Sequence, residues 1–473
     1  MTGSGPHAGC SCADNNVPPA NSKCSASTGC RMREITMSYD VNSLEAHWMP
    51  FTANRDFKSN PRMVVKSEGM YMWDYKGGQI IDGSSALFCT PAGHGRREIA
   101  EAVYNQMLAN DYTPHFQLGH PGSFELAERV CRLLPDDFNH VFFTNSGSES
   151  VETAIKVILA YQRARGQAQR NRLVSRERAY HGVNMGGVSL AGMVRNRETF
   201  GLTLPNISMI RHTWTEEQRF SKGQPLTGAE MAMDLERLAE NLGGGTLAAV
   251  FIEPVAGSTG TLVPPLGYLE KVREICDKHG MLLVFDEVIT GFGRMGTPFA
   301  TQKFNVKPDI ITMAKALTNG AIPMGGVAVT DEIYDTVMNA SPDNAIEFFH
   351  GYTYSAHPAA CAAGIATQKI YESEGLFENA ANLESYFLDA IFTLEDHPMV
   401  ADVRGIGMMA GIEVHPDGAP GRRGGEMQKK MFWNGLHVKW TGDNAIVAPA
   451  FVAERKHIDE IVDKFRKTLD EMM

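Results

Sequence analysis

Several features that mark other protein classes are missing from this sequence. No apolar run approaches the roughly 20 residues that a membrane-spanning helix needs, and the first residues lack the apolar core of a secretory signal. Basic residues are not in excess, because 44 Lys and Arg stand against 55 Asp and Glu, for a formal net charge of -11. No internal repeat is visible. We therefore expect an acidic cytoplasmic protein that binds neither nucleic acid nor a membrane.

Cysteine is scarce outside the N-terminal stretch. Four of the eight cysteines fall within residues 1–36, but their spacing, C-x-C-x11-C-x5-C, matches no zinc pattern. Because Gly, Ser, Asn and Pro surround them, we expect a disordered tail, with a metal site as the alternative. The remaining four are expected to be buried or partly buried thiols without a metal. These are Cys89, Cys131, Cys276 and Cys361.

The length of 473 residues suggests a large domain with a smaller companion. Residues 70–81 (MYMWDYKGGQII) resemble two β-rich arms around a Lys-Gly-Gly turn, which predicts a hairpin. Residues 97–109 have helical spacing of apolar side chains, and strand and helix patterns then alternate for about 250 residues. This alternation predicts an α/β fold with a parallel sheet that has helices on both faces.

A different pattern begins near residue 403 and closes with a helix at 455–472. We interpret it as the second part of the smaller, α+β domain, which would be formed by segments from both ends of the chain. The predicted division is 37–92 for its first part, 93–364 for the large domain and 365–473 for its second part.

Three apolar strands of the predicted sheet are each followed by a polar residue. Residues 140–144, 247–252 and 281–285 lead to Ser146, Glu253 and Asp286, respectively. In open α/β sheets, ligands bind beyond the carboxyl ends of the strands. We therefore expect these three polar positions to meet in one crevice.

The loop TNSGSES at 144–150 connects a strand to a helix. A helix N-terminus presents free N–H groups and the serine hydroxyls add donors, so the loop is typical of a phosphate cradle. Simple helix capping is the alternative. The helix that follows is expected to bury one face, marked by Val151, Ile155, Ile158 and Leu159.

Two charged residues follow apolar strands. A carboxylate at Asp286 needs a partner in such surroundings, although a helix cap or a buried salt bridge would also explain it. Lys315 lies in PDIITMAKALTNG (308–320), where desolvation would lower the pKa of its amine toward the range useful for a Schiff base. The alternative is a lysine whose stem packs while its amine reaches water.

An anion cradle, a carboxylate and an amine together suit one kind of cofactor. Pyridoxal phosphate (PLP) carries a phosphate, a pyridine nitrogen and an aldehyde, which match these three groups. An ionised aspartate keeps the pyridine nitrogen protonated, and this makes the ring an electron sink. The lysine holds the aldehyde and then moves a proton.

Six motifs, in order, resemble the class III PLP-dependent aminotransferases: TNSGSES, RAYHG (178–182), IEPVAG (252–257), LVFDEVITGFGR (283–294), MAKALTNGAIPMGG (313–326) and HGYTYSAHP (350–358). The resemblance runs from about Leu44 to the C-terminus. Within the class, residues 44–65 and 348–364 are most similar to the beta-alanine:pyruvate, or omega-amino acid:pyruvate, aminotransferases. The resemblance implies fold type I, in which the large domain has a mixed, mostly parallel sheet flanked by helices. It also implies ping-pong transfer of an amino group from an omega-amino acid or amine to a keto acid such as pyruvate.

The resemblance also implies residue roles. Lys315 matches the Schiff-base lysine, Asp286 the partner of the pyridine nitrogen, and Thr353 a threonine that reaches the phosphate from a neighbouring subunit of a homodimer or homotetramer. The other implied cofactor contacts are Ser146, Gly147 and Ser148 at the phosphate, Tyr180, His181 and Val288 around the ring, and Glu253 in support. Phe51, Phe88 and Ile289 fall where the family lines its substrate pocket.

One position departs from the family pattern. In GLHVKWTGDNAIVAPAF (435–451), Lys439 stands where the family usually has an arginine that grips the substrate carboxylate. Lysine keeps the charge but not the planar two-point grip. A surface lysine on an edge strand is the alternative. For the whole chain, the alternatives are a class III racemase or aminomutase and a non-catalytic binding protein on this scaffold.

Overall fold

The computed structural model describes residues 44–201 and 203–473. The chain divides into the units Met1–Pro61 and Arg62–Met473, and each is described by itself. In the first unit, helix α1 (Asn54–Ser59) begins at Asn54. The side-chain oxygen of Asn54 accepts a hydrogen bond from the N–H of Met49 at 2.9 Å. The expected tail at 1–36 lies outside the described residues.

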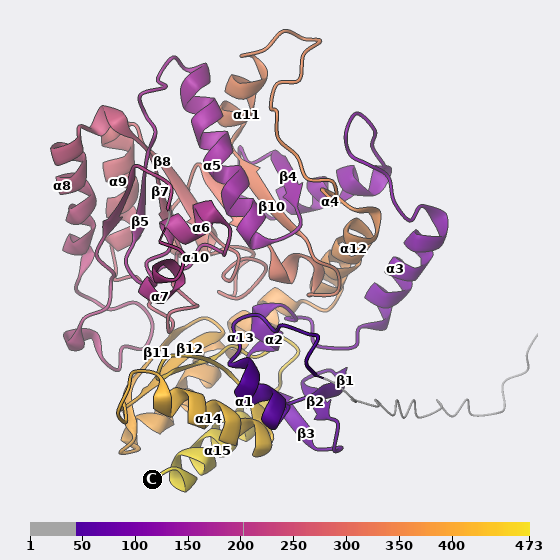
Figure 1. Cartoon of the computed structure of the whole chain (residues 1–473), viewed down its shortest axis with the longest axis vertical. Coiled ribbons are helices and arrows are strands. Elements are labelled where there is room, and N and C mark those ends of the chain that lie inside the picture. Colours follow the sequence, from indigo (N-terminus) through magenta and orange to yellow (C-terminus); the bar gives the residue numbers. More distant parts are fainter. Residues whose placement is uncertain (1–43, 202) are drawn as a thin grey trace, which may run out of the picture. The chain divides into compact units, whose positions relative to one another are not determined.

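A seven-stranded sheet forms the centre of the second unit (Figure 1). Strand β10 is antiparallel to both of its neighbours, whereas the other strands run in one direction. The predicted mixed, mostly parallel sheet is therefore confirmed. Its order is β4 (His140–Thr144), β10 (Gly325–Val329), β9 (Ile310–Met313), β8 (Leu282–Asp286), β7 (Leu247–Ile252), β5 (Arg172–Arg176) and β6 (Ile207–Ile210).

Helices cover both faces of this sheet, which explains its continuously apolar central strands. Along β7, Ala249 and Phe251 join the core on one face, whereas Val250 and Ile252 join the core on the other. The first face is covered by α5 (Gly147–Ala164), α6 (Met185–Leu190) and α11 (Asp331–Met338), and the second by α8 (Met233–Leu242) and α9 (Tyr268–His279).

Helix α5 mostly buries the predicted face. Val151, Ile155 and Ile158 are buried, but Leu159 is 40% exposed, so its place on that face was wrong. Successive helical residues are about 100° apart, and Leu159 therefore turns away from the sheet that its neighbour Ile158 covers.

The two smaller sheets use segments from both ends of the second unit. The predicted hairpin is confirmed as β2 (Tyr71–Asp74) and β3 (Gln79–Asp82); β1 (Val64–Glu68) pairs with β2, and β13 (Leu436–His437) adds in parallel to β3. The antiparallel second sheet has the order β11 (Val400–Ile406), β12 (Met409–Val414), β15 (Asn444–Val447) and β14 (Lys439–Thr441). Nearby helices are α13 (Leu376–Phe392), α14 (Arg422–Trp433) and α15 (Arg455–Glu471). The boundaries at 36, 92 and 364 stay predictions.

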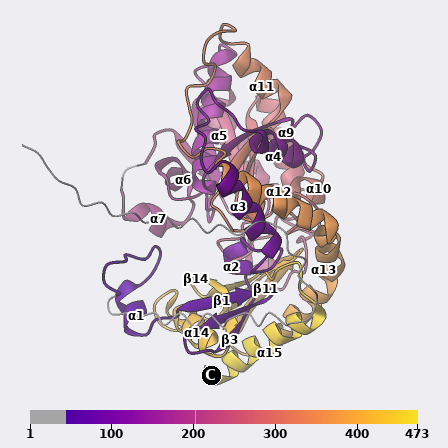
Figure 2. The same cartoon turned by 90° about the vertical axis from the view of Figure 1, so that its right-hand side faces the viewer.

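The remaining helices lie between strands in the sequence. Helices α3 (Arg97–Ala109) and α12 (Pro358–Ser373) are far apart in sequence but lie side by side (Figure 2). The others are α2 (Ser85–Phe88), α4 (Pro121–Cys131), α7 (Val194–Glu198) and α10 (Ala300–Phe304). The four cysteines after residue 44 are buried or partly buried, as expected. Within the described residues, no helix is both long and apolar enough to cross a membrane.

Candidate active site

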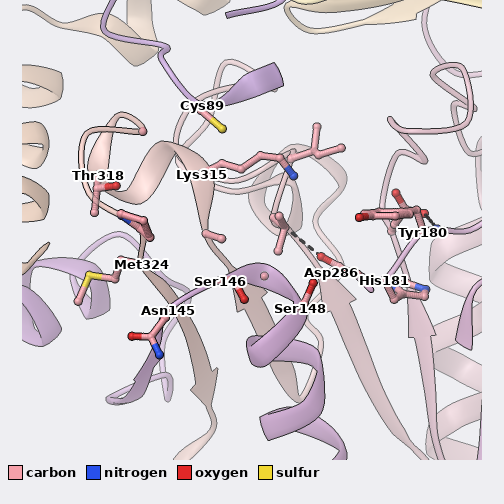
Figure 3. Close-up of a pocket in the computed structure, with 18 of the residues that line it drawn as sticks. Cys89, Asn145, Ser146, Ser148, Tyr180, His181, Asp286, Lys315, Thr318 and Met324 are labelled. Atoms are coloured by element: carbon pink, nitrogen blue, oxygen red, sulfur yellow. Dashed lines mark hydrogen bonds and ion pairs between the residues drawn. The ribbon is translucent and has the colours of Figure 1, made fainter. Parts of the chain in front are cut away.

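A cavity of about 320 Å³ lies beyond the carboxyl ends of the central strands. Figure 3 shows Ser146 and Ser148 at the start of α5, with Lys315, Asp286 and His181 facing the same space. Glu253, directly after β7, also lines this cavity. The expected meeting of three strand ends in one crevice is therefore confirmed.

The phosphate-type loop lies between β4 and α5. Ser146 caps the helix, because its hydroxyl accepts the N–H of Glu149 at 3.2 Å. The N–H groups of Gly147 and Ser148 belong to the first turn, where a helix has no carbonyl partners for them. The loop thus serves as a cap and presents donors at the positive end of an 18-residue helix.

Two glycines allow the backbone to approach this loop closely. A Cβ at Gly147 would lie 3.1 Å from both methyl groups of Val288. Gly182 has a φ of +95°, and a Cβ there would lie 2.6 Å from the Ser148 hydroxyl. A side chain at Gly182 would therefore be strained and would fill part of the cradle.

Asp286 ends β8 and is held by two donors. One carboxylate oxygen lies 2.8 Å from Nδ1 of His181, and the other accepts the N–H of Val288 at 3.2 Å. The His181 ring is buried, and its Nε2 has no partner among the described residues. Asp286 is thus a fixed hydrogen-bond acceptor at the cavity wall rather than a helix cap.

A second carboxyl group, Glu253, lies beside this pair. It accepts the N–H of Tyr180 at 2.9 Å. Burial raises the pKa of Glu253 to about 7, and the negative charge of Asp286 acts in the same direction. Near neutral pH the Glu253 carboxyl therefore binds a proton far more readily than an exposed glutamate does.

Lys315 follows β9 and begins a short 3-10 helix, Lys315–Thr318, with a left-handed φ of +47°. Such strain in a non-glycine residue is characteristic of functional sites. Burial lowers the pKa of the Lys315 amine, although Cys89, Asp286 and Glu253 oppose this effect. A larger fraction of this amine is thus neutral than in an exposed lysine.

The predicted substrate contacts differ in where they lie. Ile289 lines the cavity, whereas Phe88 is buried in the core that includes α8 and α9 and is not among the lining residues. Lys439 is half-buried on edge strand β14, and Thr353 is exposed in the loop before α12. Phe51 belongs to the unit that ends at Pro61. The roles of all these residues stay predictions.

Several lining residues were not predicted from the sequence. The segment that follows Lys315 also lines the cavity, through Thr318, Gly320, Ile322, Pro323 and Met324. The motif that contains Lys315 spans 313–326 and includes this whole segment. The length of the motif was therefore the one sign that more of its residues line the cavity. The other unpredicted lining residues are Cys89, Asn145, Gly182 and Ala314; Cys89 enters from a distant segment, and no local pattern marked it.

The cavity fits PLP by its donor set. The start of α5 offers N–H groups and hydroxyls to a phosphate, Asp286 offers a carboxylate to a ring nitrogen, and Lys315 offers an amine to an aldehyde. Tyr180 and Val288 add an aromatic and an aliphatic surface to the same cavity. These are the chemical groups that a phosphorylated pyridine aldehyde requires.

Comparisons with known proteins agree with this donor set. The model of the class-III aminotransferase family matches residues 52–469. The omega-aminotransferase of Caulobacter vibrioides is 49% identical over 92% of this chain and 99% of its own length. The beta-alanine–pyruvate aminotransferase of Pseudomonas aeruginosa is 46% identical over 92% of this chain and 97% of its own.

Solved structures give the same result. An (S)-enantioselective omega-transaminase from Thermomicrobium roseum superposes with a TM-score of 0.84 at 37% identity, over 90% of this chain and 96% of that one. The fold and the site thus define a PLP-dependent transferase of fold type I. The chain belongs to the class-III aminotransferase family and is a PLP-dependent aminotransferase.

Substitution of Gly182 tests the cradle. We expect Gly182→Ala to weaken PLP binding about tenfold or more, because the new methyl group meets the Ser148 hydroxyl and the backbone conformation disfavours alanine. PLP titration of the apoenzyme, followed by absorbance, measures this. Gly166→Ala is the matched control, since Gly166 also has a positive φ but nothing within 4 Å of the added Cβ. Equal PLP affinity in both variants would contradict this account of the cradle.

Proposed function

We propose that this aminotransferase transfers an amino group from an omega-amino acid similar to beta-alanine, or from an amine, to pyruvate. The observation that carries the proposal is the amine of Lys315 in one cavity with Asp286 and the start of α5. The substrate class is supported by the two curated relatives, whose names specify omega-amino groups, beta-alanine and pyruvate.

The residues that hold the cofactor follow from their donors. Ser146, Gly147 and Ser148 line the cavity and would bind the phosphate, and Asp286 would accept a hydrogen bond from the protonated ring nitrogen. His181 and the Val288 N–H keep the Asp286 carboxylate oriented. Tyr180 and Val288 would contact the ring. Glu253 holds the backbone of Tyr180 by accepting its N–H. When bound, PLP supplies an electron sink for the carbon that loses a proton.

Lys315 is the proton carrier. In the first half-reaction its Nζ accepts the α-proton of the amino donor and gives up a proton again before the product leaves. The keto acid half-reaction runs these transfers in reverse, and the kinetics are ping-pong because the first product leaves before the keto acid binds. A neutral amine is required for the first of these steps, and burial in the cavity favours that form.

Replacement of Lys315 tests this role. We expect Lys315→Ala to lower kcat by at least about a thousandfold, because general acid–base catalysis and the covalent hold are both lost. PLP should still bind through the phosphate contacts. Coupled assays of pyruvate consumption and absorbance of bound PLP measure the two effects. Lys303→Ala, in α10 and outside the cavity, is the control, and appreciable turnover of the Lys315 variant would overturn the assignment.

Lys439 is proposed to bind the substrate carboxylate. Its amine donates to the Thr441 hydroxyl at 3.2 Å. No carboxylate among the described residues forms an ion pair with it or acts on its pKa, so its charge remains available. Burial lowers the pKa of Lys439 to about 8, and the charge of Lys315 adds to this effect. The Lys439 amine is therefore charged below about pH 8 and becomes neutral above it.

This titration predicts a pH-dependent KM. We expect the KM for pyruvate to rise as the pH increases from 7 to 9, because Lys439 loses its charge. In Lys439→Arg the rise should disappear, since guanidinium stays protonated throughout this range. Steady-state kinetics at saturating amino donor measure both proteins. If the two pH profiles of KM coincide, Lys439 does not bind the carboxylate.

A homodimer or homotetramer with shared sites is also proposed. Thr353 lies in an exposed loop, and its carbonyl accepts a hydrogen bond from the Tyr112 hydroxyl at 2.8 Å. Exposed aromatic side chains surround this loop, including Phe116, Phe349 and Tyr354. A patch of this kind is typical of a protein interface, and through it Thr353 would reach the phosphate site of a second copy. The cytoplasmic location stays a prediction.

Charged residues in this aromatic patch test the interface. We expect the variant Phe116→Asp with Phe349→Asp to raise the dissociation constant of the oligomer at least about tenfold, because the interface would then bury two carboxylates. Sedimentation velocity over a dilution series measures it. Val194→Asp, which is similarly exposed on α7, is the control. An unchanged oligomer in the double variant would place the interface elsewhere.

A further inference from the structure

The segment before the cavity contains an unusual run of left-handed backbone. Ser85, Ala86, Leu87 and Phe88 have φ values of 46°, 44°, 67° and 68°, and none of them is glycine. Each such residue is unfavourable by itself, so neighbouring contacts must hold the run in place. Cys89 follows it directly and lines the cavity. We call residues 84–88 the left-handed turn.

Buried hydrogen bonds hold the left-handed turn. The Asp82 carboxylate accepts the N–H groups of Ser84 at 3.0 Å and Ala86 at 2.6 Å. The Ser85 hydroxyl donates to the carbonyl of Ala448 at 2.6 Å and accepts from Arg294 at 3.2 Å. The turn is therefore fixed to the C-terminal part of the chain.

Ser84 connects this turn to the strand that carries Lys439. Lys439 on β14 pairs with Ile446 on β15. The Ser84 hydroxyl accepts the N–H of Lys439 at 2.8 Å and donates to the carbonyl of Ile446 at 2.8 Å. One fully buried hydroxyl thus bridges both members of a strand pair, at the residue proposed to bind the substrate carboxylate.

Lys439 is the first residue of the short edge strand β14, which has a neighbouring strand on one side only. The contact with Ser84 therefore helps to hold its backbone. Among the described residues, the Lys439 side chain has one hydrogen bond, to the Thr441 hydroxyl, which in turn donates to the carbonyl of Ser258. A lysine carries its charge at the end of a flexible side chain, so the position of its backbone limits where the charged amine can lie. Ser84 holds the Lys439 backbone in place through its hydrogen bond to the Lys439 N–H.

We infer that Ser84 is a positioning residue for acceptor specificity: through Lys439 it sets the position at which the substrate carboxylate is bound. The inference rests on the proposed role of Lys439. It connects the left-handed turn, which ends in the cavity at Cys89, with the carboxylate site on a different sheet. Ser84 is then needed for keto acid recognition and not for proton transfer.

Two half-reactions of the holoenzyme separate these effects. In stopped-flow absorbance, we expect Ser84→Ala to weaken the apparent binding of pyruvate about five- to tenfold, the effect of one lost hydrogen-bond bridge. The half-reaction with benzylamine, which has no carboxylate, should change less than about twofold. A structural role alone would slow both half-reactions together.

Ser85→Ala is the matched control. Ser85 is the next residue in the same turn, is equally buried and also hydrogen-bonds the C-terminal part of the chain, but it makes no contact with Lys439. We expect no selective loss of pyruvate binding in this variant. If Ser84→Ala does not fold, Ser84→Cys against Ser85→Cys makes the same comparison with a weaker hydrogen-bonding group. A selective pyruvate loss in both serine positions, or in neither, overturns the inference.

A double-mutant cycle distinguishes this inference from the role of Lys439. In the Lys439→Met background, Ser84→Ala should cause no further loss of pyruvate binding, because the residue it positions is gone. If Lys439→Met alone leaves pyruvate binding unchanged, the proposed carboxylate site is wrong. If Lys439→Met weakens binding and Ser84→Ala weakens it equally in both backgrounds, the carboxylate site stands and the positioning role of Ser84 is wrong.

Discussion

The desolvated amine of Lys315, beside two buried carboxyl groups, is the constraint on which the rest of the site depends. Burial lowers the pKa of Lys315 and raises that of Glu253 to about 7, so both groups change protonation state more easily than exposed ones do. Asp286 differs, because His181 and the N–H of Val288 hold its carboxylate. A site with one fixed acceptor and one easily neutralised amine can keep a ring nitrogen protonated while it moves a proton elsewhere.

This arrangement requires a parallel sheet with both faces covered. The strands β7, β8 and β9 all end at the same edge, so Glu253, Asp286 and Lys315 reach one cavity from segments up to 62 residues apart. Helices on both faces exclude water from the strands, and the polar groups are concentrated where the strands stop. Backbone strain is found at the same edge, in the left-handed conformation of Lys315.

The residues proposed for substrate recognition and for proton transfer are supported by different sheets. Lys315 follows the seven-stranded sheet, whereas Lys439 belongs to the four-stranded sheet near the C-terminus. The left-handed turn hydrogen-bonds that smaller sheet and leads directly to Cys89 in the cavity. With the proposed roles, a division of this kind would allow the carboxylate site to change while the groups around the cofactor stay the same.

The sequence by itself determined the strands that end at Ser146, Glu253 and Asp286, the helix at 97–109, the hairpin before Asp82 and the family, because local patterning and short motifs carry that information. The patterning did not determine that β10 runs against its neighbours, and Leu159 was assigned to the wrong face of its helix. The left-handed turn and the bridge from Ser84 to Lys439 were equally invisible. The bridge joins two residues that are 355 positions apart in the chain, and only the tertiary structure brings them together.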